Sequence, residues 1–306
     1  MSSSIKPWHL KSAYQQGQNL MKMLRQEAGA QGNDEKMIEL SYDLQAGSYV
    51  GALADSTLLA RKREYCSHVA ALLDSLGPIR SILDAGMGEG NMLWLTLSQM
   101  AQPPVQIHGF DLCWSRMAVA SQWLEKQEPS FDIQISTGSL TEIPYMDSSV
   151  DVVWTNHSIE PNHGREAAIL SELYRVCSRY VVMLEPAYEL GSDEARKRMD
   201  EHGYCRNLAG IAQNLGFRVM RHEIFAGNRN PLNPTALLIL AKDETAAPVT
   251  PRRCCPVYKT ELTPMRDCWY SKESMRAYPI LGGIPCLRSS QSIVASKLAE
   301  NFHSDP

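Results

Sequence analysis

The chain has 306 residues, of which 44% are hydrophobic, 21% charged and 8% aromatic, and its formal net charge is −4. This length and balance predict one or two domains with sizeable apolar cores and exclude the disordered, collagen-like and coiled-coil classes. Without a long basic run, we expect no DNA partner. The chain has no stretch of ~20 apolar residues and no apolar signal segment, so we expect no membrane partner. Its eight cysteines are scattered, which indicates reduced thiols, and we therefore expect a cytoplasmic protein.

Residues 1–75 are predicted to form a helical N-terminal cap. Apolar residues recur there close to every 3.6 positions over Gln15–Glu27 and Leu58–Leu76, which is the period of an amphipathic helix.

Residues 76–242 alternate short apolar runs with longer amphipathic segments. Strands are predicted at Ser81–Ala85, Gln106–Asp111, Phe131–Ser136, Asp151–Thr155, Tyr180–Glu185, Phe217–Phe225 and Thr235–Ala241. Helices are predicted at Asn91–Gln102, Ser115–Gln127, Arg165–Cys177 and Ser192–Leu215, the last interrupted near Gly203. This alternation is typical of βαβ units with a parallel sheet. The link between the last two strands is too short for a helical crossover, so we expect the last strand to be antiparallel. The sequence predicts an α/β fold with a doubly wound, seven-stranded, Rossmann-like sheet.

The composition changes after Lys242. Residues 243–253 are rich in small residues and proline and are predicted to be a linker. Residues 254–298 form a Cys-, Tyr- and Pro-rich unit that we predict to be a small α+β domain, and residues 299–306 are a tail. A unit of about 45 residues is near the lower limit for independent folding. We therefore expect it to pack against the preceding domain.

The most informative segment follows the first predicted strand of the sheet. That strand delivers Asp84 to its carboxyl end, and Gly86, Gly88 and Gly90 then turn the chain into a helix. The G-x-G-x-G spacing departs from the G-x-G-x-x-G fingerprint of dinucleotide sites. Asp111 ends the next strand, where a carboxylate can accept hydrogen bonds from ribose hydroxyls. Together these residues indicate a nucleoside ligand without a pyrophosphate, although a bare turn and a helix N-cap at Asp111 are the simpler alternatives.

Four motifs carry a family resemblance. They are LDAGMGEG (83–90), GFDLCWSRM (109–117), IPYMDSSVDVVWTNHSIEP (143–161) and ELYRV (172–176). In this order they resemble the class I S-adenosylmethionine-dependent methyltransferases, in particular the ubiquinone-type branch. The resemblance implies S-adenosylmethionine as cofactor and S-adenosylhomocysteine as product.

The resemblance also implies a set of cofactor-binding residues. Asp84 and the glycine loop Gly86–Gly90 would hold the methionine end, and Asp111 the ribose. Ser139 and Leu140 would lie along the adenine, although many relatives have Asp where this chain has Ser139. Further cofactor-binding candidates are Leu112, Asn156 and Tyr49, the last of which could be a lid or could simply pack.

The C-terminal unit resembles a second family. The stretches CPVYKTEL (255–262) and AYPILGGIP (277–285) are similar to zinc-ribbon-like proteins that include the activating subunit of tRNA and protein methyltransferases. Tyr258 stands where the second metal-binding cysteine would be, and only Cys255, Cys268 and an off-register Cys254 remain. Because a structural zinc site needs four nitrogen or sulfur ligands, we expect a degenerate unit without a metal.

Methyl transfer is an in-line displacement that needs alignment and, for a protonated nucleophile, a base. Candidate catalytic residues near the predicted ends of the fourth and fifth strands are His157, His163 and Glu185. A solvated loop is the alternative for each histidine, and a capping acceptor for Glu185. Because Asn-Pro-Pro-Tyr is absent after the fourth strand, we favour O- or N-methylation of a small molecule. RNA or protein methylation and a non-catalytic, cofactor-binding scaffold are the alternatives, and a homodimer is a further expectation.

Overall fold

The computed structural model describes residues 7–30, 32–228 and 230–301. Residues 1–6 and 31 of the predicted cap and residues 302–306 of the predicted tail lie outside the described residues. No helix within these ranges is both long and apolar enough to cross a membrane.

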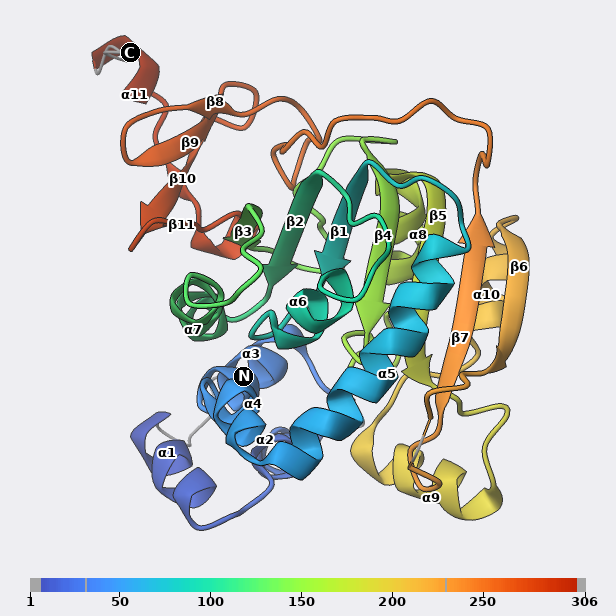
Figure 1. Ribbon diagram of the computed structural model, residues 1–306. Helices are drawn as coiled ribbons and strands as arrows, with labels where there is room; N and C mark the ends of the chain where they lie inside the picture. The colour runs from blue at the N-terminus through green and yellow to red at the C-terminus, as the bar shows by residue number, and fades with distance from the viewer. Residues whose placement is uncertain (1–6, 31, 229, 302–306) are drawn as a thin grey trace.

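A seven-stranded sheet with the order β3-β2-β1-β4-β5-β7-β6 forms the centre of the molecule (Figure 1). Its strands are β1 (Ser81–Ala85), β2 (Gln106–Asp111), β3 (Ile133–Thr137), β4 (Val150–Asn156), β5 (Cys177–Pro186), β6 (Arg218–Ile224) and β7 (Thr235–Ala241). Strand β7 runs antiparallel to both β5 and β6, and the other neighbouring pairs are parallel. The α/β fold, the seven strands and the antiparallel last strand are thus confirmed. The order reverses between β1 and β4, which creates a crevice at their carboxyl ends.

Helices cover both faces of the sheet and bury it. One apolar cluster joins it to α5 (Ser56–Asp74), α6 (Asn91–Leu97) and α7 (Trp114–Leu124). A second cluster joins the opposite face to α8 (Glu166–Val176) and α10 (Leu208–Asn214). Because both faces are covered, β1 and β5 are buried along their whole length, as expected for central strands in a doubly wound fold.

The N-terminal cap lies beyond the carboxyl ends of β1, β2 and β4 (Figure 1). Its elements are α1 (Pro7–Gln15), α2 (Leu20–Ala28), α3 (Glu35–Asp43), α4 (Ser48–Gly51) and the 3-10 turn η1 (Ala52–Ala54). The prediction of one helix over Gln15–Glu27 is wrong. Gly17 has a φ of 74° and Asn19 caps α2 by accepting a hydrogen bond from the Lys22 amide, so the chain breaks between α1 and α2.

Other predicted boundaries differ in instructive ways. Helix α6 ends at Leu97 instead of Gln102, and the Ala101 amide donates to the Asp74 carboxylate at 2.9 Å instead of continuing the helix. Strand β5 begins at Cys177, at the C-cap of α8, without an intervening turn. The predicted helix Ser192–Leu215 is divided, as its glycine suggested, into α9 (Asp193–His202) and α10, because Gly203 adopts a φ of 69°.

The C-terminal unit forms a separate small sheet beside β3 and α7 (Figure 1). Its elements are β8 (Thr263–Pro264), β9 (Cys268–Ser271), β10 (Arg276–Leu281), β11 (Ile284–Pro285), η2 (Ser289–Gln291), β12 (Ile293–Val294) and α11 (Leu298–Asn301). Ile284 belongs to the core of the large sheet, whereas Trp269 and Tyr278 pack into a small cluster of the unit itself. Cys286 forms a β-bridge to Thr137. The unit therefore packs against the domain of the large sheet, as expected for so short a segment.

The predicted linker is held against the amino edge of the sheet. The Asp151 carboxylate accepts hydrogen bonds from the amides of Arg80, Ser81 and Val249 at 2.9, 3.1 and 3.0 Å, and Arg253 forms a β-bridge to Tyr145. These hydrogen bonds and this bridge hold residues 243–253 along the sheet, so that the C-terminal unit reaches strand β3 at the edge of the sheet.

Hydroxyl groups surround Cys255 of the C-terminal unit. The Cys255 sulfur lies 3.3 Å from the Tyr278 hydroxyl and 3.6 Å from that of Ser274, whose amide bonds to Ser271. Burial alone would raise the pKa of Cys255, but these hydrogen bonds outweigh it and lower the pKa. Cys268 lies elsewhere, on β9 opposite Pro279.

We expect purified protein to contain far less than one zinc per chain, since hydroxyls are poor ligands for structural zinc. Within the described ranges, no group of three or more His, Cys, Asp or Glu side chains is arranged to hold a metal. Metal analysis, with melting curves in and out of a chelator, checks the prediction. One zinc per chain, or a chelator-induced fall in melting temperature, would contradict it.

Candidate active site

The glycine loop makes the floor of a cavity at the carboxyl ends of β1, β2 and β4. The amides of Gly86 and Met87 both donate to the Phe110 carbonyl at 2.9 Å. Gly86 has a φ of +88°, and a Cβ atom placed on it would lie 2.3 Å from the Ser158 Cβ. Only glycine allows this turn and this close approach, so the loop is locked between β2 and the segment after β4.

Asp111 forms the wall of the cavity next to the glycine loop. One carboxylate oxygen accepts from the Gly88 amide at 3.0 Å and the other from the Cys113 amide at 2.9 Å. The residue is 9% exposed and lines the cavity. A carboxylate offers about four acceptor positions, so each oxygen can accept one further hydrogen bond from a ligand.

Asp84 is a buried carboxylate for which the described residues provide no hydrogen-bond partner. It is 3% exposed and lines the cavity. Burial, followed by the charges of Asp111 and Glu185, raises its pKa well above the ordinary value. A cationic ligand group beside Asp84 would relieve this penalty.

The cap covers the cavity with two helices. Glu35, Ile38 and Tyr42 line it from one face of α3, and Tyr49 lines it from α4. Because they are spaced by three and four residues, the three α3 side chains project from the same side of the helix.

Glu89 fastens the second of these helices to the glycine loop. Its carboxylate accepts hydrogen bonds from the amides of Gly47 and Val50 at 2.9 and 2.7 Å. Because Gly47 caps α4, the acidic side chain lies at the positive end of that helix. The glycine loop therefore positions the segment that carries Tyr49.

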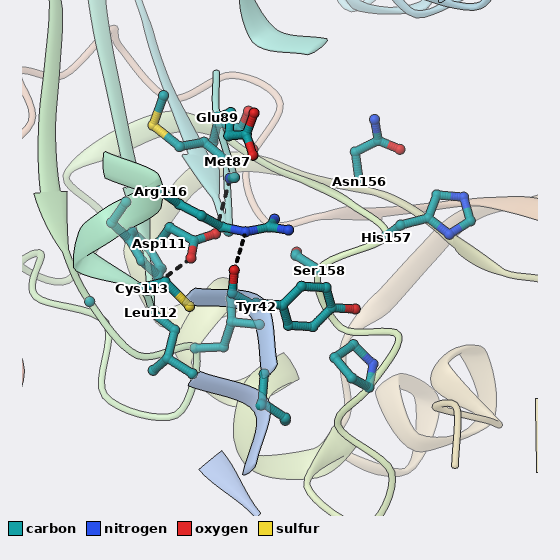
Figure 2. Close-up of a pocket in the computed structure, with 18 of the residues that line it drawn as sticks. Tyr42, Met87, Glu89, Asp111, Leu112, Cys113, Arg116, Asn156, His157 and Ser158 are labelled. Carbon is teal, nitrogen blue, oxygen red and sulfur yellow. Dashed lines mark hydrogen bonds between the residues drawn. The ribbon is translucent and has the colours of Figure 1, made fainter. Parts of the chain in front are cut away.

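Arg116 reaches across the cavity toward the segment after β4 (Figure 2). Its guanidinium lies 4.6 Å from the centres of both the Tyr42 and Tyr49 rings, and its Nε donates to the Tyr42 carbonyl at 3.2 Å. Burial alone would lower the pKa of Arg116, but Asp111, Tyr49 and Cys113 together outweigh burial and raise it. Its Nη2 is buried without a partner among the described residues, so it could donate to a ligand.

The segment after β4 supplies the opposite wall. Asn156 accepts a hydrogen bond from the Tyr65 hydroxyl at 3.0 Å. His157 has a φ of +55°; its Nδ1 lies 2.5 Å from the Glu160 carboxylate and its Nε2 2.9 Å from the Thr235 hydroxyl. Burial alone would lower the pKa of His157, but Glu160 outweighs it and raises the pKa. The strained backbone and the two bonds hold the imidazole in one orientation.

Four of the predicted site residues do not line the cavity. Gly90 caps α6 behind the loop, and the Ser139 hydroxyl bonds to the Glu35 carboxylate instead of facing the cavity. His163 bonds to Glu166 at 2.9 Å outside the cavity. Glu185 lies beneath the segment after β4, where it accepts from the amides of Ser158 and Glu160 at 3.1 Å. His163 and Glu185 thus do not line the cavity, and a catalytic role for either residue stays a prediction.

The other nine predicted residues meet at the cavity: Tyr49, Asp84, Gly86, Gly88, Asp111, Leu112, Leu140, Asn156 and His157. Sequence reasoning missed Glu35, Ile38, Tyr42, Glu89 and Arg116. The i, i+3, i+7 spacing of the three α3 residues was a usable signal, whereas nothing local indicated that Arg116 would turn into the cavity.

The buried acids and His157 predict a pH dependence of stability. Burial raises the pKa of Glu185 to about 7, so the folded state keeps a proton that the unfolded state releases above its lower, ordinary pKa. The raised pKa of His157 likewise gives stability that is lost as the pH rises through the folded value. The free energy of unfolding should therefore fall between about pH 5 and pH 8.

Urea unfolding across this pH range measures the slope. Glu185→Gln removes one titrating group and should flatten the curve below about pH 7. Glu189→Gln, a substitution in the segment after β5, should leave the wild-type slope. A stability that rises with pH, or an unchanged slope in Glu185→Gln, would show that these groups do not control it.

Comparisons with known proteins show which family part of this chain resembles. Residues 82–179 match the family model described as "Methyltransferase domain". Indolepyruvate C-methyltransferase from Streptomyces griseus is 26% identical over 162 residues, which are 51% of this chain and 48% of that protein. The chain thus spans about half the length of this curated relative.

Solved structures with a similar backbone include two methyltransferases. Magnesium protoporphyrin IX methyltransferase (ChlM) from Synechocystis PCC 6803 with bound SAM has a TM-score of 0.49 and 16% identity, covering 69% of this chain and 98% of the other. Geranyl diphosphate C-methyltransferase from Streptomyces coelicolor A3(2) has a TM-score of 0.45 and 12% identity, covering 56% and 78%. Residues 82–179 thus form a methyltransferase domain.

Proposed function

From this domain we propose that the whole protein is an enzyme that transfers the methyl group of S-adenosylmethionine to a small molecule. The observation that carries the proposal is the cavity in which the glycine loop, Asp84 and Asp111 meet beneath the cap. The nine predicted residues on its walls support the sequence interpretation.

The charges of the cavity fit the cofactor. Bound S-adenosylmethionine supplies a methyl group on a positively charged sulfur. Asp84, which has no partner among the described residues, would hold the methionine ammonium group, and Asp111 would accept from the ribose hydroxyls. Glu89 and Glu35 add further negative charge to the walls, against the single cation Arg116 among the described lining residues. This balance favours a cationic ligand.

The cap favours a small acceptor. Helices α3 and α4 lie over the cavity and bring Tyr42 and Tyr49 against it. A cavity under helices suits a molecule that it can enclose, whereas a folded protein or RNA would need an open approach.

We do not expect DNA as a partner. A homodimer and a cytoplasmic location remain predictions.

Two side chains, Tyr42 and His157, would orient the molecule that accepts the methyl group. The Tyr42 hydroxyl has no hydrogen bond among the described residues, and burial, then Glu160, raises its pKa, so it stays a neutral donor. His157 is the candidate base. The Glu160 carboxylate favours the proton on Nδ1, which leaves Nε2 to accept a proton from the substrate once the substrate displaces the Thr235 hydroxyl that now lies 2.9 Å from Nε2. Glu185 and His163 would act only through the segments they hold.

We propose an oxygen or nitrogen atom of the acceptor as the methylation site, because His157 can remove the proton that such a nucleophile loses. Carbon is the second candidate, since the curated relative is named as a C-methyltransferase.

The test uses cofactor that carries a deuterated methyl group, incubated with the protein and cell extract. We expect label in the low-mass fraction by mass spectrometry and none with the Asp111→Asn variant. Label in a filter-retained polymer would favour RNA or protein as acceptor. Binding of S-adenosylhomocysteine without transfer to any extract would favour a scaffold.

A further inference from the structure

One carboxylate of the cavity comes from the cap. Glu35 is the first residue of α3 and lines the cavity together with Leu112, Gly138 and Leu140. The Ser139 hydroxyl donates to one oxygen of Glu35. The other oxygen lies 3.6 Å from the Arg288 guanidinium. Both carboxylate oxygens are thus held, and each has acceptor capacity left.

Arg288 belongs to the C-terminal unit and is 5% exposed. Its Nη1 donates to the Glu39 carboxylate at 2.5 Å and to the Leu112 carbonyl at 3.2 Å. It therefore ties one turn of α3 to the loop that follows β2. Three parts of the chain meet at Glu35: the cap, the sheet domain and the C-terminal unit.

The position of Glu35 relates it to the base of the nucleoside. If the ribose binds at Asp111 and the methionine end over the glycine loop, the base would extend the other way, past Leu112, which also lines the cavity. Of the four carboxylates among the described lining residues, Asp84, Glu89 and Asp111 belong to the glycine loop and the ribose wall. Glu35 alone lies among the residues of the base end.

Apolar groups complete this end of the cavity. Ile38 projects from the same face of α3 as Glu35, and Leu112 and Leu140 line the cavity with it. An aromatic base can pack between such side chains, while its exocyclic amino group needs an acceptor at the edge of the ring. Ser139 does not line the cavity, and its hydroxyl oxygen is already engaged: it donates to Glu35, accepts from the Thr141 amide at 3.1 Å and lies 2.9 Å from the Thr141 hydroxyl.

We propose that Glu35 is the residue that recognises adenine, by accepting a hydrogen bond from its amino group. Arg288 and Ser139 are positioning residues that hold the Glu35 carboxylate. The C-terminal unit thereby completes the cofactor site through a single arginine. This assignment rests on the proposed function, because it takes the ligand to be S-adenosylmethionine.

The test compares two ligands by calorimetry, S-adenosylhomocysteine and its inosine analogue, in which a carbonyl oxygen replaces the amino group. Wild-type protein should prefer the adenine ligand by roughly tenfold or more. Glu35→Gln should abolish or invert the preference, since a glutamine amide can donate to the inosine oxygen. Glu39→Gln is the matched control: it removes a partner of the same arginine, does not line the cavity, and should keep the wild-type ratio.

Arg288 has its own readout. Arg288→Gln should lower the adenine preference toward that of Glu35→Gln, and Arg288→Lys should restore part of it. A loss of melting temperature at an unchanged ratio would show that Arg288 only stabilises the fold and would overturn its positioning role.

The outcomes separate the two proposals. If wild-type protein binds S-adenosylhomocysteine and Glu35→Gln keeps the wild-type ratio, the assignment of Glu35 is wrong while the proposed function stands. If wild-type protein binds neither ligand, the proposed function itself fails.

Discussion

Asp111→Asn should weaken binding of S-adenosylhomocysteine about 100-fold or more. The substitution removes the charge that two ribose hydroxyls would meet, and a hydrogen bond to a charged group contributes about 1.5–3 kcal/mol. It also replaces one acceptor by a donor amide facing the amide of Gly88 or Cys113, both of which donate to Asp111. Calorimetric titration measures the dissociation constant.

The matched control is Asp132→Asn, the same chemical change beside the amino end of β3, away from the cavity. It should bind the ligand like wild-type protein. If Asp111→Asn melts at the wild-type temperature and binds with unchanged affinity, the ribose does not lie at Asp111.

Gly86→Ala should destabilise the protein by about 3 kcal/mol and abolish cofactor binding. A positive φ costs a residue with a Cβ about 1–2 kcal/mol, and overpacking costs about 1–3 kcal/mol. Here the new methyl group would lie 2.3 Å from the Ser158 Cβ. To yield, Ser158 must give up the hydrogen bond that it donates to the Ala85 carbonyl at 2.7 Å.

Gly77→Ala separates the two contributions. Gly77 has a φ of +81° and nothing within 4 Å of a new Cβ, so its substitution reports the backbone strain alone. The double variant Gly86→Ala, Ser158→Gly should recover the stability lost to the steric contact. Urea unfolding of wild-type protein, Gly77→Ala, Gly86→Ala, Ser158→Gly and the double variant gives this coupling. If Gly86→Ala costs no more than Gly77→Ala, the loop is not locked against Ser158.

The sheet could be predicted because its signals are local. Buried central strands read as continuous apolar runs, and the prediction of β7 matches the structure at both ends. The ends of helices were harder to predict, because they depend on single residues: Gly17, with its positive φ, ends the run of α1, and Asn19 caps the start of α2. The start of β5 at Cys177, directly after α8, leaves no turn signal to read.

The floor of the site could be predicted for the same reason: Asp84, the glycine loop and Asp111 lie within two successive strand ends. Its roof could not be predicted. Glu35 and Tyr42 reach the cavity only because the cap folds back over the sheet, which is a contact between segments far apart in sequence. The role of the C-terminal unit was open for the same reason, since Arg288 and Glu39 are 249 residues apart.

A crystal structure of the protein with S-adenosylhomocysteine tests the central claim most directly. The account predicts one ligand molecule under the cap, with its ammonium group at Asp84, its ribose hydroxyls at Asp111 and its adenine amino group at Glu35. Density for the ligand at another place, or a cavity that stays filled by the Arg116 and Tyr42 side chains at saturating ligand, would contradict it.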